Sequence, residues 1–323
     1  MSAIFAVISC EDAAMKLEGI HHITAITGDA PQNVEFYVGV LGLRMVKKTV
    51  NQDDPSVYHL FYGDERGDPG ADLTFFEYPG VVPGRAGAGM VHTVGWRVGS
   101  EDTLDFWEQR FAAEGVTHAR TEHGLGFSDR EGLQHELRVY RGDQPALAAS
   151  APDIPAEHAL QGFDAARAYA TDPARSAELL GESLGFKPVN DSEWQVGGDQ
   201  RSSYYVYDPA PAEPGIQGAG SVHHIAFATY PDDQDAWQKR MRDAGTHATP
   251  VIDRFYFRSI YFREPAGVLF ELATMGPGFT ADEPLEELGQ NLSLPPDFEH
   301  LRDSLGGVLT PLPDPRTERA NTV

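Results

Sequence analysis

The chain has 323 residues, of which 41% are hydrophobic and 23% are charged, and its formal net charge is −24. Its 49 acidic residues outnumber the 25 basic ones, so its surface should repel nucleic acid and anionic membranes. No run of 18 apolar residues occurs, which excludes a membrane-spanning helix, and the single cysteine, Cys10, excludes a disulfide within the chain.

The acidic excess predicts a cytoplasmic protein from a halophilic source, because concentrated salt screens the repulsion between surface carboxylates. An acidic protein from a cell at ordinary salt is the alternative. The first residues lack the basic start and the small-residue cleavage site of a signal peptide. We therefore interpret residues 1–16 as an N-terminal extension, with Met15 as an alternative start.

A pattern of one strand, an amphipathic helix and further strands recurs four times along the chain. In chain order, the strands are expected at 19–26, 44–50, 57–63, 72–78, 90–98, 132–140, 162–170, 202–208, 221–229, 254–262 and 267–273. The four helices are expected at 31–41, 102–114, 173–184 and 233–244, the third of them capped by Asp172. One more short helix is expected near 296–304.

These repeats predict an α+β fold, in which four βαβββ modules pair into two curved mixed-sheet half-barrels with the helices outside. A first domain is expected at 17–145 and a second at 158–275, each with two modules, separated by a Pro/Ala-rich linker. Residues 276–323 are expected to wrap around the outside as a tail. A doubly wound parallel fold is disfavoured, because several strands rather than one follow each helix.

Two histidine pairs, His21-His22 and His223-His224, lie near the start of the first strand of the first and fourth units. Adjacent residues of a strand point to opposite faces, so one histidine of each pair can face a shared cavity. His22 and His224 alternate with small and polar residues, whereas His21 and His223 alternate with bulkier residues that we expect to pack on the helices. The alternation therefore selects His22 and His224 as candidate metal ligands.

Glu271 lies in the closing strand of the fourth unit, GVLFELA, among apolar neighbours. A buried carboxylate needs a partner, and a metal ion supplies one. Two imidazoles and one carboxylate suit non-haem Fe(II), although Mn, Zn or Ni could take the same ligands. On spacing alone, purely structural histidines remain the alternative. His92 and Glu136 match similar places in the second unit, but the third unit has Ala165 where a histidine is needed, so no second site is expected.

The segments GIHHITAITGDA, VYHLFYGDERGDPG, SVHHIAFA and RFYFRSIYFREPAGVLFELAT together resemble the hydroquinone-type ring-cleaving dioxygenases of the vicinal oxygen chelate superfamily. The resemblance covers residues 18–310. It implies that the first and last units pair and that His22, His224 and Glu271 hold Fe(II). It also implies that a hydroquinone or catechol reacts there with O₂. Ala266 departs from the family's usual REPGG, a small change within a turn.

The chemistry that this resemblance implies assigns supporting roles to several further residues. Tyr261, expected on the strand next to Glu271, could donate a hydrogen bond to substrate or to bound oxygen, and Arg254 could stabilise negative charge. The other candidates are two histidines that steady the ligands and two residues that contact the substrate, namely His21, His223, Thr24 and His59. A purely structural role is the alternative for each of them.

Two alternative functions would also require a cavity of this kind. A glyoxalase-like isomerase or lyase would hold zinc or nickel and would need a further acidic ligand, for which Glu77 is the candidate. A protein that sequesters aromatic drugs would need no metal. The expected partners are a small aromatic substrate and O₂, neither nucleic acid nor a membrane, and a second copy of the chain in a homo-oligomer.

Overall fold

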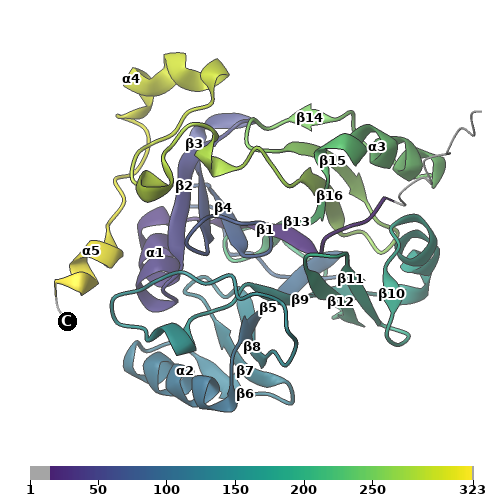
Figure 1. The fold of residues 1–323 in the computed structure, drawn as a ribbon, viewed down its shortest axis with the longest axis horizontal. Coiled ribbons are helices and arrows are strands. Elements are labelled where there is room, and N and C mark those ends of the chain that lie inside the picture. The colour runs from purple at the N-terminus through teal and green to yellow at the C-terminus, as the bar shows by residue number, and fades with distance from the viewer. Residues whose placement is uncertain (1–14, 322–323) are drawn as a thin grey trace, which may run out of the picture.

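The computed structural model describes residues 15–321, so Cys10 and most of the expected N-terminal extension lie outside the described residues. Two eight-stranded mixed sheets form the body, and the helices lie on the outside (Figure 1). The expected α+β fold of curved mixed sheets is confirmed. In the part of the chain that the structure describes, no helix has the length and apolar character that crossing a membrane requires.

The first sheet combines the first and fourth modules, with the strand order β14-β15-β16-β13-β1-β4-β3-β2. Its strands are β1 (Ile20–Thr27), β2 (Arg44–Asn51), β3 (Asp54–Gly63), β4 (Asp72–Glu77), β13 (Val222–Thr229), β14 (Ile252–Asp253), β15 (Arg258–Arg263) and β16 (Leu269–Thr274). At its centre β1 runs antiparallel to β13 and parallel to β4. The pairing of first and last modules is thereby confirmed.

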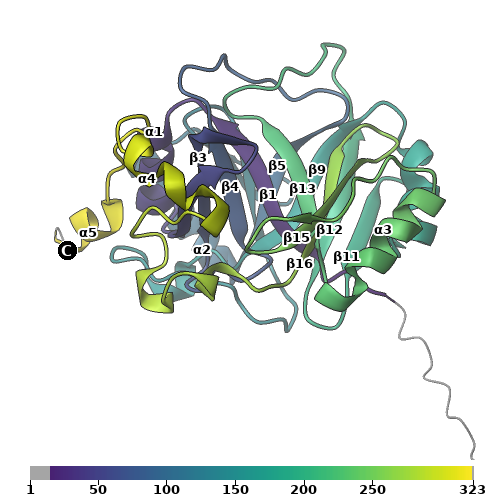
Figure 2. The same cartoon turned by 90° about the horizontal axis from the view of Figure 1, so that it is seen from above.

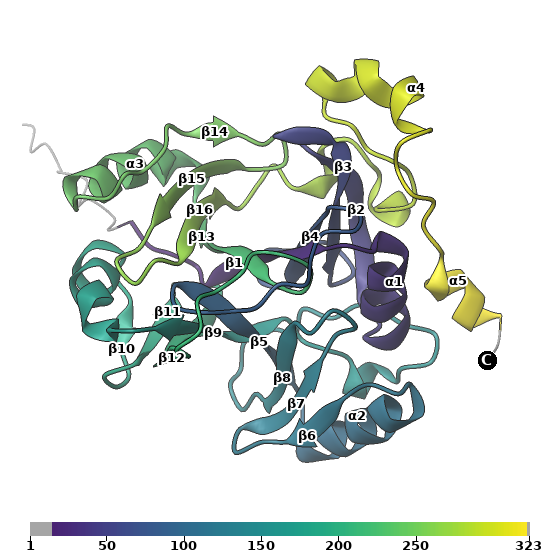
Figure 3. The ribbon, with the colours of Figure 1, turned by 180° about the vertical axis from the view of Figure 1, so that it is seen from behind.

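The second sheet combines the second and third modules, in the order β10-β11-β12-β9-β5-β8-β7-β6. Its strands are β5 (Met90–Val98), β6 (His118–Arg120), β7 (Gly124–Ser128), β8 (Gln134–Val139), β9 (Phe163–Ala170), β10 (Lys187–Pro188), β11 (Glu193–Gly197) and β12 (Ser202–Pro209). Figure 3 shows the two sheets from behind, with β1 and β13 in one and β5 and β9 in the other. Each sheet thus draws on both halves of the chain, while the expected domain boundaries stay a prediction.

The helices largely match their expected places. They are α1 (Ala30–Val34), α2 (Glu101–Ala113), α3 (Gln234–Asp243), α4 (Arg302–Leu305) and α5 (Pro315–Ala320). The first continues as a π-helical turn at Glu35–Val40, and the third module has a 3₁₀ turn at Pro173–Ser176 and a π-helical turn at Leu179–Ser183 in place of the continuous helix expected. Each wide turn contains a glycine, Gly39 or Gly181, and glycine weakens α-helix.

The capping and core patterns follow from the sequence. Asp172 accepts a hydrogen bond from the backbone N–H of Ala174, as its expected role as a cap requires. Helix α2 buries Leu104, Trp107 and Phe111 on one stripe against its sheet, the spacing of an amphipathic helix. This burial of large apolar side chains fixes the helices on the outer faces of the sheets.

The strand expected at 254–262 is partly wrong, because the chain turns at 254–257 and β15 begins only at Arg258. Phe255 in this turn has a φ of 69°, a conformation that no strand contains. The five strands β6, β7, β10, β11 and β14 were not assigned individually from the sequence, since each has only two to five residues. Arg254 consequently lies in a loop rather than on a strand.

The tail from residue 276 packs on β2 and β3 at the edge of the first sheet, as Figure 2 shows from above. The Phe279 ring lies 5.0 Å from that of Phe61. Lys47 on β2 is fully buried, and its Nζ donates to Asp282 Oδ1 at 2.7 Å, to Glu283 and to the carbonyl oxygen of Phe279. A buried ammonium group therefore anchors the tail through two carboxylates.

We predict that Lys47→Met destabilises the protein by about 3–5 kcal/mol, because it leaves the buried Glu283 carboxylate without its cation and also removes the ion pair with Asp282. Urea unfolding followed by circular dichroism measures the change. The control is Lys239→Met, which removes a solvent-exposed ion pair with Asp243 and should cost less than about 1 kcal/mol. Equal losses for the two variants would contradict the anchoring role of Lys47.

Candidate metal centre

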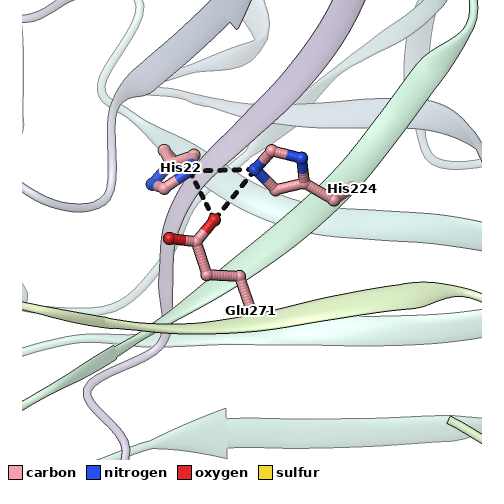
Figure 4. Close-up of side chains that lie close together, drawn as sticks. All are labelled: His22, His224 and Glu271. Carbon is pink, nitrogen blue, oxygen red and sulfur yellow. Dashed lines mark hydrogen bonds and ion pairs between the residues drawn. The ribbon is translucent and has the colours of Figure 1, made fainter. Parts of the chain in front are cut away.

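Three side chains that lie far apart in the sequence converge at the centre of the first sheet (Figure 4). His22 lies on β1, His224 on β13 and Glu271 on β16, which are three consecutive strands of that sheet. His22 Nε2 lies 3.3 Å from His224 Nε2, and Glu271 Oε2 lies 3.2 Å and 2.9 Å from these two nitrogens. All three side chains are buried. The convergence predicted from strand alternation is what the structure shows.

The chemistry of these donors fits a divalent cation. Glu271 Oε1 accepts a hydrogen bond from Ser259 Oγ at 2.5 Å, whereas Oε2 is buried without a hydrogen-bond partner. A fully buried carboxylate oxygen that faces two imidazole nitrogens is costly unless a cation lies between them. Two histidines and one carboxylate are a common ligand set for first-row transition metals.

A chain of hydrogen bonds sets the tautomer of His22. The carbonyl oxygen of Thr274 can only accept, so His21 Nε2, 3.2 Å away, must carry the proton. A neutral His21 then accepts at Nδ1 from His22 Nδ1, which lies 3.0 Å away. His22 Nε2 is left with its lone pair directed at the candidate centre, which is the form that binds a metal.

The expected orientation of His21 and His223 is wrong. The β1–β13 ladder contains two bulges, in which His21 and His223 are the extra residues of their strands. A bulge interrupts the alternation of faces, so each ring lies beside its neighbouring ligand, with centroids 5.1 Å apart in both pairs. The two histidines therefore contact the rings of His22 and His224 instead of packing on the helices.

Burial and close neighbours shift the pKa values of His21, His224 and Glu271. Burial lowers the pKa of His224 and, with the neighbouring His22, lowers the pKa of His21 to about 3. Burial also opposes ionisation of Glu271, but His22 and His224 outweigh it and hold the pKa of Glu271 well below its ordinary value. Without a cation, the carboxylate of Glu271 is therefore stabilised only where the two histidines direct N–H groups toward it, and a bound metal ion would take the place of those protons.

A cavity opens onto the candidate centre and holds about 440 Å³ of empty space, its mouth included. Aromatic rings and polar side chains share its wall, which comprises His22, Thr49, Asn51, Gln52, Asp53, His59, Phe61, Phe76, His224, Arg254, Tyr256, Phe257, Tyr261 and Glu271. His59 thus lines the cavity as expected. Thr24 lies behind the wall, with its hydroxyl 2.8 Å from Thr74 Oγ1, which in turn lies 3.0 Å from His59 Nε2.

Tyr261 and Arg254 both line the cavity. Tyr261 lies opposite Glu271 in the β15–β16 ladder, and its ring centroid is 5.7 Å from that of His224. The Arg254 guanidinium is bound to the carboxylate of Asp53 through contacts of 3.0 and 2.9 Å, and it lies 5.5 Å from the Tyr261 ring. The two residues therefore reach the cavity as neighbours, from a strand and from the preceding loop.

The sequence analysis did not identify several wall residues, notably Phe257, Tyr256 and Thr49. The ring of Phe257 lies 5.2 Å from that of His22, although 235 residues separate them in the sequence. Such residues carry no motif, because their place depends on how a loop folds back. Alternation along β2 could have placed Thr49 and Asn51 on one face, but it does not show which face is inward.

The second sheet repeats the geometry without the ligands. Its β5–β9 ladder has matching bulges, and Thr93 and Ala165 stand where the first sheet has His22 and His224. His92 is a bulge residue whose Nε2 contacts Asp208 at 2.9 Å, while Glu136 accepts from Thr121. Among the described residues only His22, His224 and Glu271 form a cluster that could hold a metal.

Glu77, the acidic ligand that an isomerase would need, does not join the centre. Its Oε1 accepts the backbone N–H of Ala30 at 3.1 Å, at the start of α1. It is absent from both the ligand cluster and the wall of the cavity within residues 15–321. The observed donor set is therefore two histidines and a single glutamate.

Comparison with known proteins finds relatives along almost the whole chain. A profile of the Glyoxalase/Bleomycin resistance protein/Dioxygenase superfamily matches residues 19–136 and 162–272. A Bacillus subtilis (strain 168) protein provisionally named ring-cleaving dioxygenase MhqA is 38% identical, over 92% of this chain and 100% of its own. The chlorohydroquinone/hydroquinone 1,2-dioxygenase of Sphingobium indicum is 33% identical, over 90% of this chain and 95% of its own. A crystal structure of a Bacillus subtilis protein, provisionally described as a dioxygenase, superimposes with a TM-score of 0.87 at 37% identity, covering 93% of this chain and 99% of that one.

We predict that the protein binds one divalent ion per chain and that His22→Ala, His224→Ala and Glu271→Gln each abolish stoichiometric binding, because each removes a donor from a three-residue site. Elemental analysis after dialysis measures the metal content. The matched control is His92→Ala, a histidine at a bulge of the second sheet, which should retain the metal. Full metal content in all three ligand variants would contradict the site.

Proposed function

The chain belongs to the glyoxalase/bleomycin resistance protein/dioxygenase superfamily, and from this membership we propose that it is an Fe(II)-dependent ring-cleaving dioxygenase that acts on a hydroquinone- or catechol-type aromatic compound. The observation that carries the proposal is the buried cluster of two histidines and one glutamate at the base of a small aromatic-walled cavity. Similarity over nearly the full length to a chlorohydroquinone/hydroquinone 1,2-dioxygenase supports it.

In this proposal His22, His224 and Glu271 hold the metal. Bound Fe(II) would supply the redox chemistry that lets a phenolic compound react with O₂. Manganese, zinc or nickel would fit the same donors, so the choice of iron follows from the proposed reaction. We propose an extradiol-type reaction, in which the ring opens beside the carbon that carries the metal-binding hydroxyl.

The surrounding residues would orient the substrate and handle protons. Burial and the Glu271 carboxylate raise the pKa of Tyr261, so its phenol stays protonated and can donate a hydrogen bond into the cavity. Arg254 offers a positive charge near the same point, and His21 keeps His22 in its metal-binding tautomer. His223 Nδ1 lies 2.8 Å from His224 Nδ1 and would steady that ligand, and His59 would contact the substrate.

The two other functions have weaker support. A glyoxalase-like isomerase would need a second acidic ligand, and Glu77 instead caps α1. A protein that only sequesters aromatic compounds would gain nothing from a fully buried, ionised Glu271, whose desolvation is unfavourable without a cation.

We further propose that the protein works in the cytoplasm of a halophilic cell and that copies of it associate into a homo-oligomer. The excess of acidic residues supports the first part, because a net charge of −24 is tolerated best where salt screens it.

We predict that the iron-loaded protein consumes O₂ when it is given a hydroquinone, which an oxygen electrode measures under conditions that suppress autoxidation. Tyr261→Phe should lower kcat by about 10²-fold or more while changing KM little, because its hydrogen bond is expected to act during the reaction. Glu271→Gln serves as the inactive control. No O₂ uptake by the wild type across hydroquinones and catechols would contradict the proposed reaction.

We also predict that the free energy of unfolding rises between low salt and about 2 M KCl, since salt screens repulsion among surface carboxylates. Thermal unfolding at a series of KCl concentrations measures it, and equal transition temperatures throughout would contradict a halophilic source.

A further inference from the structure

The first sheet curls until its two edges meet across the cavity from the candidate metal ligands. Lys47 of β2 lies with its Nζ 4.7 Å from the ring of Tyr256, in the loop between β14 and β15. Gln52 of the same edge donates to the carbonyl oxygen of Arg254 at 2.8 Å. His22, His224 and Glu271 lie on central strands, so the joined edges form the wall that faces them.

Thr49 on this wall has a buried hydroxyl without a close hydrogen-bond partner, and that hydroxyl lies near enough to the Tyr256 phenol to lower its pKa. Its side chain is only 2% exposed, and it lies directly opposite His59 in the β2–β3 ladder. Other polar side chains of the wall have partners: His59 contacts Thr74, and Asn51 donates to Tyr78. Because buried hydroxyl groups are nearly always hydrogen-bonded, Thr49 has hydrogen-bonding capacity that a ligand in the cavity could use beside Tyr256.

Tyr256 on the same wall has its only proton engaged. Its hydroxyl donates to Asp282 Oδ2 at 2.9 Å, and Asp282 is held in turn by Lys47 at 2.7 Å. Burial and the Asp282 carboxylate raise the pKa of Tyr256, so the phenol does not ionise near neutral pH. The oxygen of Tyr256 can therefore offer a ligand only its lone pairs.

We propose that Thr49 and Tyr256 are specificity-determining residues that bind a second hydroxyl group of the aromatic substrate, at the end of the ring away from the metal. That hydroxyl would donate to Tyr256 Oη and accept from Thr49 Oγ. This inference rests on the proposed function and deepens it. The two oxygens of a hydroquinone lie at opposite ends of the ring and can occupy both places, whereas those of a catechol are adjacent.

The buried Lys47 gains a role in this arrangement. Lys47 binds the Asp282 carboxylate, which accepts the only proton of the Tyr256 hydroxyl. The wall therefore favours a hydrogen-bond donor on the ligand over an atom of similar size that cannot donate. The tail thus contributes to recognition through Asp282, although Asp282 is not part of the cavity wall.

The test compares the binding of hydroquinone and 4-fluorophenol to the iron-loaded protein without O₂, so that no turnover occurs. Both ligands carry one metal-binding hydroxyl, and fluorine replaces the second hydroxyl without being able to donate. The wild type should bind hydroquinone roughly tenfold more tightly, the factor expected for a buried hydrogen bond. Tyr256→Phe should bring the ratio of the two Kd values close to one, because it removes the acceptor for the second hydroxyl. Thr49→Val should lower the ratio by a smaller factor, because the hydrogen bond to Tyr256 remains. In both variants the Kd of 4-fluorophenol should change less than about twofold.

The control is Tyr204→Phe on β12 of the second sheet, which should keep the wild-type ratio. An unchanged ratio in both Thr49→Val and Tyr256→Phe, or a wild type that does not distinguish the two ligands, would overturn the inference. Thr49→Val and Tyr256→Phe alter different side chains. If circular dichroism shows that one variant is unfolded, the ratio of Kd values for the other variant still tests the inference. O₂ uptake by the wild type is measured separately and tests the proposed function. Failure of the proposed reaction can therefore be distinguished from failure of the inference about Thr49 and Tyr256.

Discussion

The burial of an ionised glutamate beside two histidines is the constraint on which the rest of this structure depends. Glu271 is fully buried, yet its pKa is held well below the ordinary value by His22 and His224. Such a charge is stable only if its partners are placed accurately and kept in the right protonation state. The central strands, the bulges and the hydrogen-bond chain through His21 all contribute to that placement.

The bulges show how one ladder can supply both a ligand and its support. An unbroken strand would direct His21 away from His22, and the hydrogen bond between their Nδ1 atoms could not form. The second sheet keeps the same bulges but has Thr93 and Ala165 at the two ligand places. The bulged ladder is therefore repeated in both sheets, while the candidate metal ligands occur in the first sheet. This agrees with the general rule that function depends on the site more than on the fold.

The tail helps to form the wall around the cavity. Its Phe279 packs on Phe61, and its acidic residues bind Lys47 on the inner side of β2. Through Asp282 the same segment contacts Tyr256 in the wall of the cavity. A segment that the sequence presents as an outer wrapping thus also shapes the cavity in which we propose that the reaction occurs, because its charges satisfy a buried lysine.

The sequence by itself determined the repeated modules, the mixed-sheet fold and the three candidate ligands, because hydrophobic periodicity and strand alternation are local properties. Tertiary structure alone decided which way His21 and His223 turn, since a bulge is a mismatch between two strands and neither strand encodes it alone. Tertiary structure also brings Thr49 close to Tyr256, and Lys47 close to Asp282. Each of these pairs joins segments more than 200 residues apart, and their contact depends on how far the sheet curls.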